Sequence, residues 1–194
     1  MSIALDNFRN DFLYASSWET RKDGPPLYLL DKLDATELAV AEMELISHLS
    51  KDDFWPVSAL GYIRSQNALP SLYNLLYRAS SYGKVITAHA IFNICKDEQM
   101  IDIVEREIKN QWNSTHLIDI IYTLPDFDNE RTNKILHDLR EHEEYLVAYN
   151  ATRALQLPTE EIVERFRQKK IAANKISQNS PERNKLSWWQ KIFS

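Results

Sequence analysis

The stretch SALGYIRSQNALPSL, residues 58–72, contains the end of one predicted helix, a short turn and the start of a second helix. The polar run at 65–67 marks the turn, because Ser and Asn side chains bond to nearby backbone groups and compete with the helix. Apolar residues at helical spacings lie on both sides of this run. The stretch therefore predicts a helical hairpin, and the fold depends on whether this hairpin is repeated.

The first helix of the hairpin recurs three more times along the chain. The four copies end at Ile63, Ile94, Leu124 and Leu155, in steps of 31, 30 and 31 residues. Four positions before each end lies a column of mostly small residues, on the same helix face as the end residue. The members of this column are Ala59, Ala90, Ile120 and Ala151. Small side chains at these positions indicate that a neighbouring helix packs closely against each copy.

Each copy is followed by a second helical pattern with apolar residues at helical spacings. These patterns span residues 68–78, 98–109, 130–142 and 158–168. An earlier unit begins at Asp34, which forms a capping-box-like pair with Glu37 ahead of the helix predicted at 34–49. Its partner is the irregular segment 25–33. Paired helices with a period near 30 residues predict an α-solenoid, with a compact helical bundle as the alternative.

The small-residue column, the period and the ALGYI…ALPSL phrase resemble HEAT-like repeats, in the short form also found in bilin lyases. The resemblance extends over about residues 25–170. It implies an all-α fold, a right-handed α-solenoid of about four to five HEAT-like hairpins. We therefore expect a repeat domain at 1–170, followed at 171–194 by a polar linker and a short amphipathic helix.

Composition excludes several classes of protein and of site. Three glycines argue against Gly-rich phosphate loops, and a single cysteine excludes an intramolecular disulfide. No signal peptide is apparent, and no stretch approaches the roughly 18 apolar residues of a membrane span. We expect a cytoplasmic protein.

The charge is divided unevenly along the chain. Residues 165–194 contain eight of the 23 basic and one of the 28 acidic residues, a charge of +7. The rest of the chain keeps 15 basic and 27 acidic residues, a charge of −12. An acidic body repels nucleic acid and attracts basic partners, although the same charge also serves solubility. We expect no nucleic-acid binding by the body.

The chain contains no recognisable catalytic or metal-binding pattern. Only His142-Glu143 forms the His-Glu pair that the repeats of HEAT-like di-iron enzymes would need. His89, beside the small-residue column, is interpreted as packed at a helix contact, and Cys95 as a small core residue. We predict no catalytic residue, no metal ligand and no cofactor.

In HEAT-like stacks the second helices line the concave face, which is the usual binding surface. Two tyrosines and several acidic residues occupy the outward positions of these predicted helices, and they suit a basic protein partner. The alternative is an ordinary solvated helix face. The predicted partner-binding residues are Tyr73, Tyr77, Asp102, Glu105, Asp138 and Glu141.

The N-terminal phrase DGPPLYLLDKLDATELAVAEMELI, residues 23–46, stands ahead of the short repeats. This arrangement is similar to bacterial HEAT-repeat immunity proteins of polymorphic toxin systems. The resemblance implies a non-enzymatic protein that binds and neutralises a toxin domain, which we expect to be basic. The alternatives are an enzyme or enzyme subunit of bilin-lyase type that acts on another protein, or a membrane-associated scaffold.

The C-terminal segment ends in an apolar and basic phrase, KLSWWQKIFS, at 185–194. Three interpretations of this phrase remain open. It forms a cap over the last repeat, it docks as an amphipathic helix in a partner's groove, or it rests on a membrane surface.

Overall fold

The structure is a computed structural model that describes residues 2–109 and 114–178. Within these residues every regular element is a helix and there is no strand, so the predicted all-α class is confirmed. The α-helices are α1 (Ile3–Phe8), α2 (Trp18–Arg21), α3 (Ala35–Ser47), α4 (Trp55–Tyr62), α5 (Leu69–Arg78), α6 (Ser81–Cys95), α7 (Gln99–Ile108), α8 (Ser114–Ile121), α9 (Glu130–Arg140), α10 (Tyr145–Ala154) and α11 (Glu160–Gln178). The shorter elements are the π-helical η1 (Arg9–Leu13) and the 3₁₀ turns η2 (Leu27–Lys32), η3 (Gln66–Ala68) and η4 (Leu124–Phe127).

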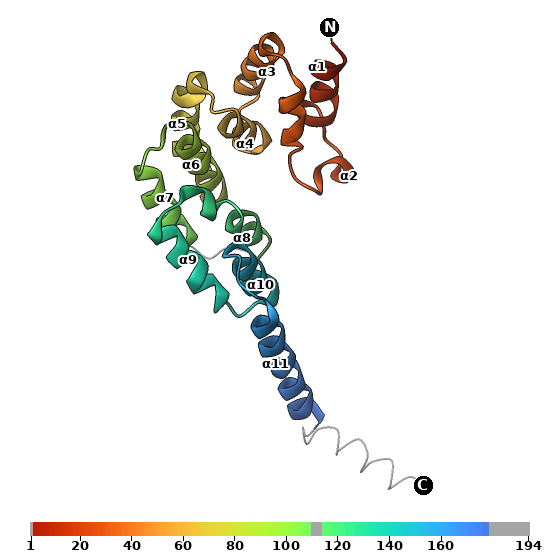
Figure 1. Cartoon of the computed structure of the whole chain (residues 1–194), viewed down its shortest axis with the longest axis vertical. Helices are drawn as coiled ribbons and strands as arrows, with labels where there is room; N and C mark the ends of the chain where they lie inside the picture. The colour runs from red at the N-terminus through yellow and green to blue at the C-terminus, as the bar shows by residue number, and fades with distance from the viewer. Residues whose placement is uncertain (1, 110–113, 179–194) are drawn as a thin grey trace.

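The four sequence copies form the helices α4, α6, α8 and α10, which we call the first helices. Consecutive first helices contact one another, from α4 to α6, from α6 to α8 and from α8 to α10. The helices α5, α7, α9 and α11, which we call the second helices, pack against them. Figure 1 shows the resulting elongated arrangement, in which α5, α7 and α9 lie along one side and α1 and α11 at opposite ends.

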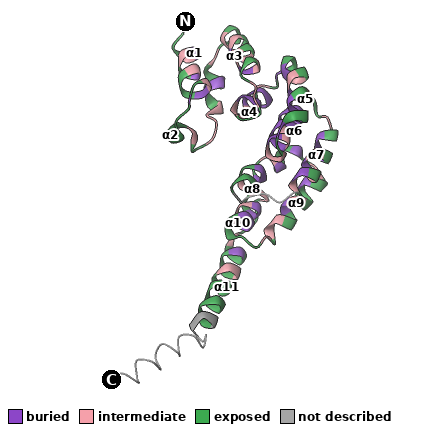
Figure 2. Cartoon of the chain, turned by 180° about the vertical axis from the view of Figure 1, so that it is seen from behind, coloured by how far each residue is buried: buried purple, intermediate pink, exposed green. Residues whose placement is uncertain are grey.

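The predicted column is buried at every copy. Ala59, Ala90, Ile120 and Ala151 are inaccessible or nearly so, and the residues after them are fully buried. These following residues are Leu60, Ile91, Ile121 and Thr152. Figure 2 shows the buried residues on the facing sides of the helices, whereas α11 is exposed over most of its length. The column therefore marks the contacts between helices, as the sequence pattern predicted.

The closest approach between two first helices occurs at Gly61. A Cβ atom at this position would lie 2.8 Å from the backbone Cα of Ala90 and 2.9 Å from its Cβ. Such distances are shorter than van der Waals contact, so any side chain at residue 61 would push α4 away from α6. The glycine is required here by packing between the helices.

The turns after the first helices contain residues in the left-handed region, and none of these residues is a glycine. Arg64 and Gln156 have φ values of 53° and 56°, and each closes its helix with the same pair of backbone hydrogen bonds. In the first turn the Ser65 amide donates to the Leu60 carbonyl, and in the second the Leu157 amide donates to the Thr152 carbonyl. Both are the 6→1 hydrogen bond of a Schellman motif. The two turns lie three repeat periods apart, and their shared geometry repeats the sequence period.

The N-terminal unit is anchored by the capping box that the sequence predicted. The Asp34 side chain accepts from the Thr36 and Glu37 amides at 2.9 Å, and Glu37 accepts from the Asp34 amide at 3.0 Å. Ahead of α3, the rings of Phe8 and Phe12 stack at 5.4 Å and are buried. The irregular segment predicted at 25–33 contains the 3₁₀ turn η2.

The C-terminal boundary differs from the expected one. Helix α11 continues to Gln178 and so crosses the boundary that we placed at residue 170. The segment 169–178 contains no glycine or proline, which explains why the helix does not stop. Residues 179–194, with the expected amphipathic helix, lie outside the described residues. Among the helices that the structure describes, none is long and apolar enough to cross a membrane.

Replacing Gly61 with Ala is expected to lower the free energy of unfolding by about 1–3 kcal/mol, because the new methyl group overpacks the contact with Ala90. Urea denaturation would measure the change. Helix propensity alone predicts a gain of about 1 kcal/mol for the same substitution. A stabilised variant would therefore contradict the close approach of α4 and α6.

Replacing Arg64 with Gly, only three residues away, is expected to have the opposite sign. A left-handed conformation costs an L-residue about 1–2 kcal/mol and glycine loses about 0.5–1 kcal/mol through backbone entropy, so a net gain of about 0.5–1 kcal/mol should remain. Gln156→Gly should give a similar gain because its turn has the same hydrogen bonds. Loss of stability in both variants would show that the long side chains, and not the backbone, determine these turns.

Candidate binding groove

The structure contains a groove of about 590 Å³ between the N-terminal segment and the first helices. One wall is formed by residues of the segment 21–27, which follows and includes the end of α2. The other wall is formed by the start and inner face of α4, by α6, and by the stretch from α8 to η4. Figure 1 shows α2, α4 and α8 on the side of the molecule opposite to α5, α7 and α9.

The groove follows a single column of the repeat. Ser58, His89 and Asp119 occupy the position just before the small-residue column in successive copies, and all three line the groove. One turn later in each copy are three more lining residues, Tyr62, Asn93 and Thr123. None of the lining residues of the groove lies on α5, α7 or α9, the second helices that we expected to line the concave face of the stack.

The N-terminal wall is held in place by Arg21. Its guanidinium donates to both carboxylate oxygens of Asp53, at 2.6 and 3.1 Å, and to the Ala15 carbonyl at 3.0 Å. It also lies 4.0 Å from the centre of the Trp55 ring. A paired and stacked guanidinium is one of the stronger surface contacts, so Arg21 fastens the segment after α2 to the start of α4.

Two tyrosines line the groove, and their hydroxyl groups are already bonded within the chain. Tyr62 donates to the Asp31 carboxylate at 2.7 Å, and Tyr122 donates to the Asn150 side chain. Their side chains remain 45% and 47% exposed. Because the hydroxyl groups have partners within the chain, the ring faces are the parts that remain available for contact.

A third ring, Tyr82, is more deeply packed. It stacks on His116 with 4.5 Å between ring centroids and contacts Phe54 edge-on. Phe54 lies against Gly83, where a Cβ atom would fall 2.2 Å from its ring. Burial, together with the nearby Asp119 carboxylate, raises the pKa of Tyr82 far above its usual value. Tyr82 therefore stays a neutral hydrogen-bond donor.

Two carboxylates lie at the α8 end of the groove. The Tyr82 hydroxyl donates to Asp119 at 3.4 Å, and His89 Nε2 lies 2.9 Å from Asp126 and 3.0 Å from the Asn93 amide. Desolvation raises the pKa of Asp119, and the hydrogen bond from Tyr82 offsets this only in part. The groove thus combines aromatic surface with negative charge.

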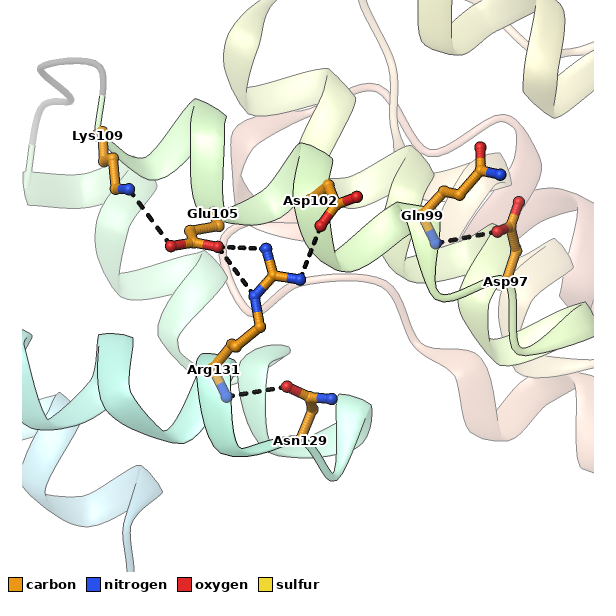
Figure 3. A network of polar contacts seen from close by, with 7 residues as sticks. All are labelled: Asp97, Gln99, Asp102, Glu105, Lys109, Asn129 and Arg131. Atoms are coloured by element: carbon orange, nitrogen blue, oxygen red, sulfur yellow. Dashed lines mark hydrogen bonds and ion pairs between the residues drawn. The ribbon is translucent and has the colours of Figure 1, made fainter.

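The six predicted partner-binding residues lie on the second helices or directly after them, outside the groove. Asp102 and Glu105 point to Arg131 of α9, which reaches across from the neighbouring second helix (Figure 3). The guanidinium lies 2.7 Å from Asp102 and 3.0 Å from Glu105, and Lys109 approaches Glu105 at 3.3 Å. The hydrogen bond from Arg131, and to a smaller extent the one from Lys109, holds the pKa of Glu105 below its usual value. The two acids therefore join α7 to α9.

The other four differ in their surroundings. Tyr73 donates to Asp97 at 2.6 Å, a hydrogen bond that raises the pKa of the tyrosine, and Glu141 forms an ion pair with Arg165. Tyr77 is 85% exposed and Asp138 is exposed. None of the six residues lines the groove, and their role in binding stays a prediction.

Two single-residue interpretations have different outcomes. His89 is largely covered and lies 5.6 Å from the Phe127 ring, in agreement with packing at a helix contact. The interpretation of Cys95 as a core residue is wrong, because its side chain is exposed. Helix α6 ends at Cys95 and the chain turns at Lys96, whose φ is 56°, so position 95 lies beyond the packed face.

Among the residues that the structure describes, no group of three or more His, Cys, Asp or Glu side chains could hold a metal ion.

Comparisons with family models, with curated proteins and with solved structures found no match to this chain. A function is therefore inferred from the groove and from the charge and burial of the residues around it.

Replacing Asp119 with Asn is expected to stabilise the protein at pH 7 and not at pH 3. A carboxyl with a raised folded-state pKa binds more protons when folded, so its contribution to stability falls as pH rises from the unfolded to the folded pKa. Thermal melts at the two pH values would test this, with Asp138→Asn as the exposed control. A lower melting temperature for Asp119→Asn at pH 7 would show that the charged carboxylate supports the fold.

Proposed function

We propose that this protein is a non-enzymatic, protein-binding α-solenoid of HEAT-like repeats that holds its partner in the groove. The observation that carries the proposal is the groove itself, which presents partly exposed aromatic rings beside carboxylates over three successive first helices. Exposed aromatic side chains grouped in this way are typical anchors of protein interfaces.

The repeated burial pattern supports the solenoid. The same column is buried at all four copies, and consecutive first helices contact one another in order. Two of the turns also close with identical hydrogen bonds. In a solenoid each unit contacts only its neighbours, and a continuous surface forms along each layer.

The state of the tyrosines supports binding through the groove. A ring that is already fixed by a hydrogen bond loses little conformational entropy when a partner covers it. Tyr62 and Tyr122 are fixed in this way, by Asp31 and Asn150, and each keeps nearly half of its surface exposed. Rigid aromatic rings of this type act as anchors in protein interfaces.

The concrete version of the proposal is an immunity protein that neutralises a basic toxin domain. The phrase at 23–46, which resembles the N-terminal part of such proteins, includes Gly24, Pro25 and Leu27, which line the groove. The charge of −12 outside residues 165–194 favours a basic partner and accelerates encounter with it.

A pair of matched double variants would test where the partner binds. The groove variant is Tyr62→Ser with Tyr122→Ser, and the control is Tyr28→Ser with Tyr77→Ser, two exposed tyrosines outside the groove. The partner would first be captured from the native host by the tagged wild-type chain and identified by mass spectrometry. Its affinity for each purified variant would then be measured by calorimetry.

We expect the groove variant to bind at least about tenfold more weakly, since an aromatic anchor contributes more than about 1 kcal/mol, and the control to bind as the wild type does. If the partner is a toxin, co-expression of the wild type should relieve its growth arrest and the groove variant should not. Loss of binding in the control alone would indicate that the partner binds to the second helices, where Tyr77 lies, and not in the groove. Capture of a bound chromophore, or of several subunits of a larger complex, would contradict the proposal.

A further inference from the structure

The groove already contains one bound arginine, which belongs to the chain itself. Arg21 stacks on Trp55 and donates to both oxygens of Asp53. An aromatic face and a carboxylate together recognise a guanidinium, because the ring attracts the cation and the carboxylate accepts two parallel N–H bonds. The N-terminal end of the groove therefore demonstrates how this fold holds an arginine.

The α8 end presents the same two kinds of group, an aromatic ring and a carboxylate, with histidines as the basic neighbours: His89 lies 2.9 Å from Asp126, and His116 interacts with Asp119. Asp119 lies on α8 and Tyr122 directly after the end of this helix, three residues further on, and both line the groove. Asp126 follows in η4 and lines it too. The Tyr122 hydroxyl is bonded to Asn150, so the part of this side chain that faces a ligand is its ring.

The acids of the groove differ from those of the second helices in their partners. On the second helices, Asp102 and Glu105 are paired with Arg131, and Glu141 with Arg165. In the described part of the chain, neither Asp119 nor Asp126 forms an ion pair with a lysine or arginine. Asp119 accepts from a tyrosine hydroxyl, and His89 beside Asp126 carries a positive charge only when protonated.

This difference determines whether the α8 end would accept a positively or a negatively charged ligand. Desolvation raises the pKa of Asp119, while the hydrogen bond from Tyr82 and the charge of nearby His116 lower it only in part, so this carboxylate gains from an added cation. The basic side chains that line the groove, Arg21 and Lys22, belong to its other end. A cationic side chain of a partner therefore belongs at α8.

We propose that the protein partner places an arginine side chain in the α8 end of the groove, with its guanidinium against the Tyr122 ring and between the carboxylates of Asp119 and Asp126. This inference rests on the proposed function and names the chemistry that the groove recognises. Arginine fits better than lysine, because a planar guanidinium both stacks on a ring and forms parallel bonds to a carboxylate.

Fluorescein-labelled peptides of eight residues, with alternating glycine and arginine, would test the inference by fluorescence anisotropy. Matched peptides would carry lysine or neutral citrulline in place of arginine. The groove variant is Asp119→Asn with Asp126→Asn. The control is Glu98→Gln with Glu143→Gln, which changes the net charge equally at exposed positions outside the groove and outside the predicted partner-binding set.

We expect the arginine peptide to bind more tightly than the lysine peptide and the citrulline peptide not to bind. The groove variant should weaken the arginine peptide about tenfold, as expected for two partly exposed charge pairs, and the control less than about twofold. Tyr122→Leu should reduce the preference for arginine over lysine. Equal weakening by the groove variant and the control, or equal binding of the arginine and lysine peptides, would overturn the inference.

Binding of the captured partner to the two groove variants distinguishes a failure of this inference from a failure of the proposed function. If the partner is lost from Tyr62→Ser with Tyr122→Ser but retained by Asp119→Asn with Asp126→Asn, binding in the groove stands and the arginine contact is wrong. If both variants retain the partner, the groove is not the binding surface. Loss from both, with binding by the control unchanged, supports both proposals.

Discussion

The close contact between consecutive first helices is the constraint on which the rest of the structure depends. Gly61 and Ala90 bring α4 and α6 so near to each other that no additional carbon atom fits between them. The residues that follow the small-residue column are fully buried at every copy. This spacing also aligns Ser58, His89 and Asp119 along one surface, so the packing that stabilises the first helices creates the wall of the groove.

The N-terminal segment completes the groove, and polar contacts hold this segment against the helices. Arg21 bonds to Asp53 ahead of α4, while Arg9 of η1 bonds to Glu44 of α3. Each pair joins residues more than 30 positions apart. Residues of the segment 21–27 therefore face the first helices across the groove.

Negative charge is used in two different ways on the two layers. On the second helices it is neutralised within the chain, since Arg131 bridges Asp102 and Glu105 and thereby joins α7 to α9 (Figure 3). In the groove, Asp119 accepts a hydrogen bond from Tyr82, and Asp126 lies beside His89. When His89 is neutral, the negative charge of Asp126 is not compensated by this partner. The acids of the second helices thus join neighbouring helices, whereas Asp119 and Asp126 are bonded to a tyrosine and a histidine.

The sequence by itself determined the helical class and the buried column, because the side chains that face a neighbouring helix must recur with the helical period. It also determined the cap at Asp34, a local interaction over three residues. Only the tertiary structure decided which residues line the groove, that Cys95 is exposed, and that Asp102 and Glu105 are paired with Arg131. These properties depend on the rotation between successive helix pairs and on contacts across 26 or more residues, which a local pattern does not specify.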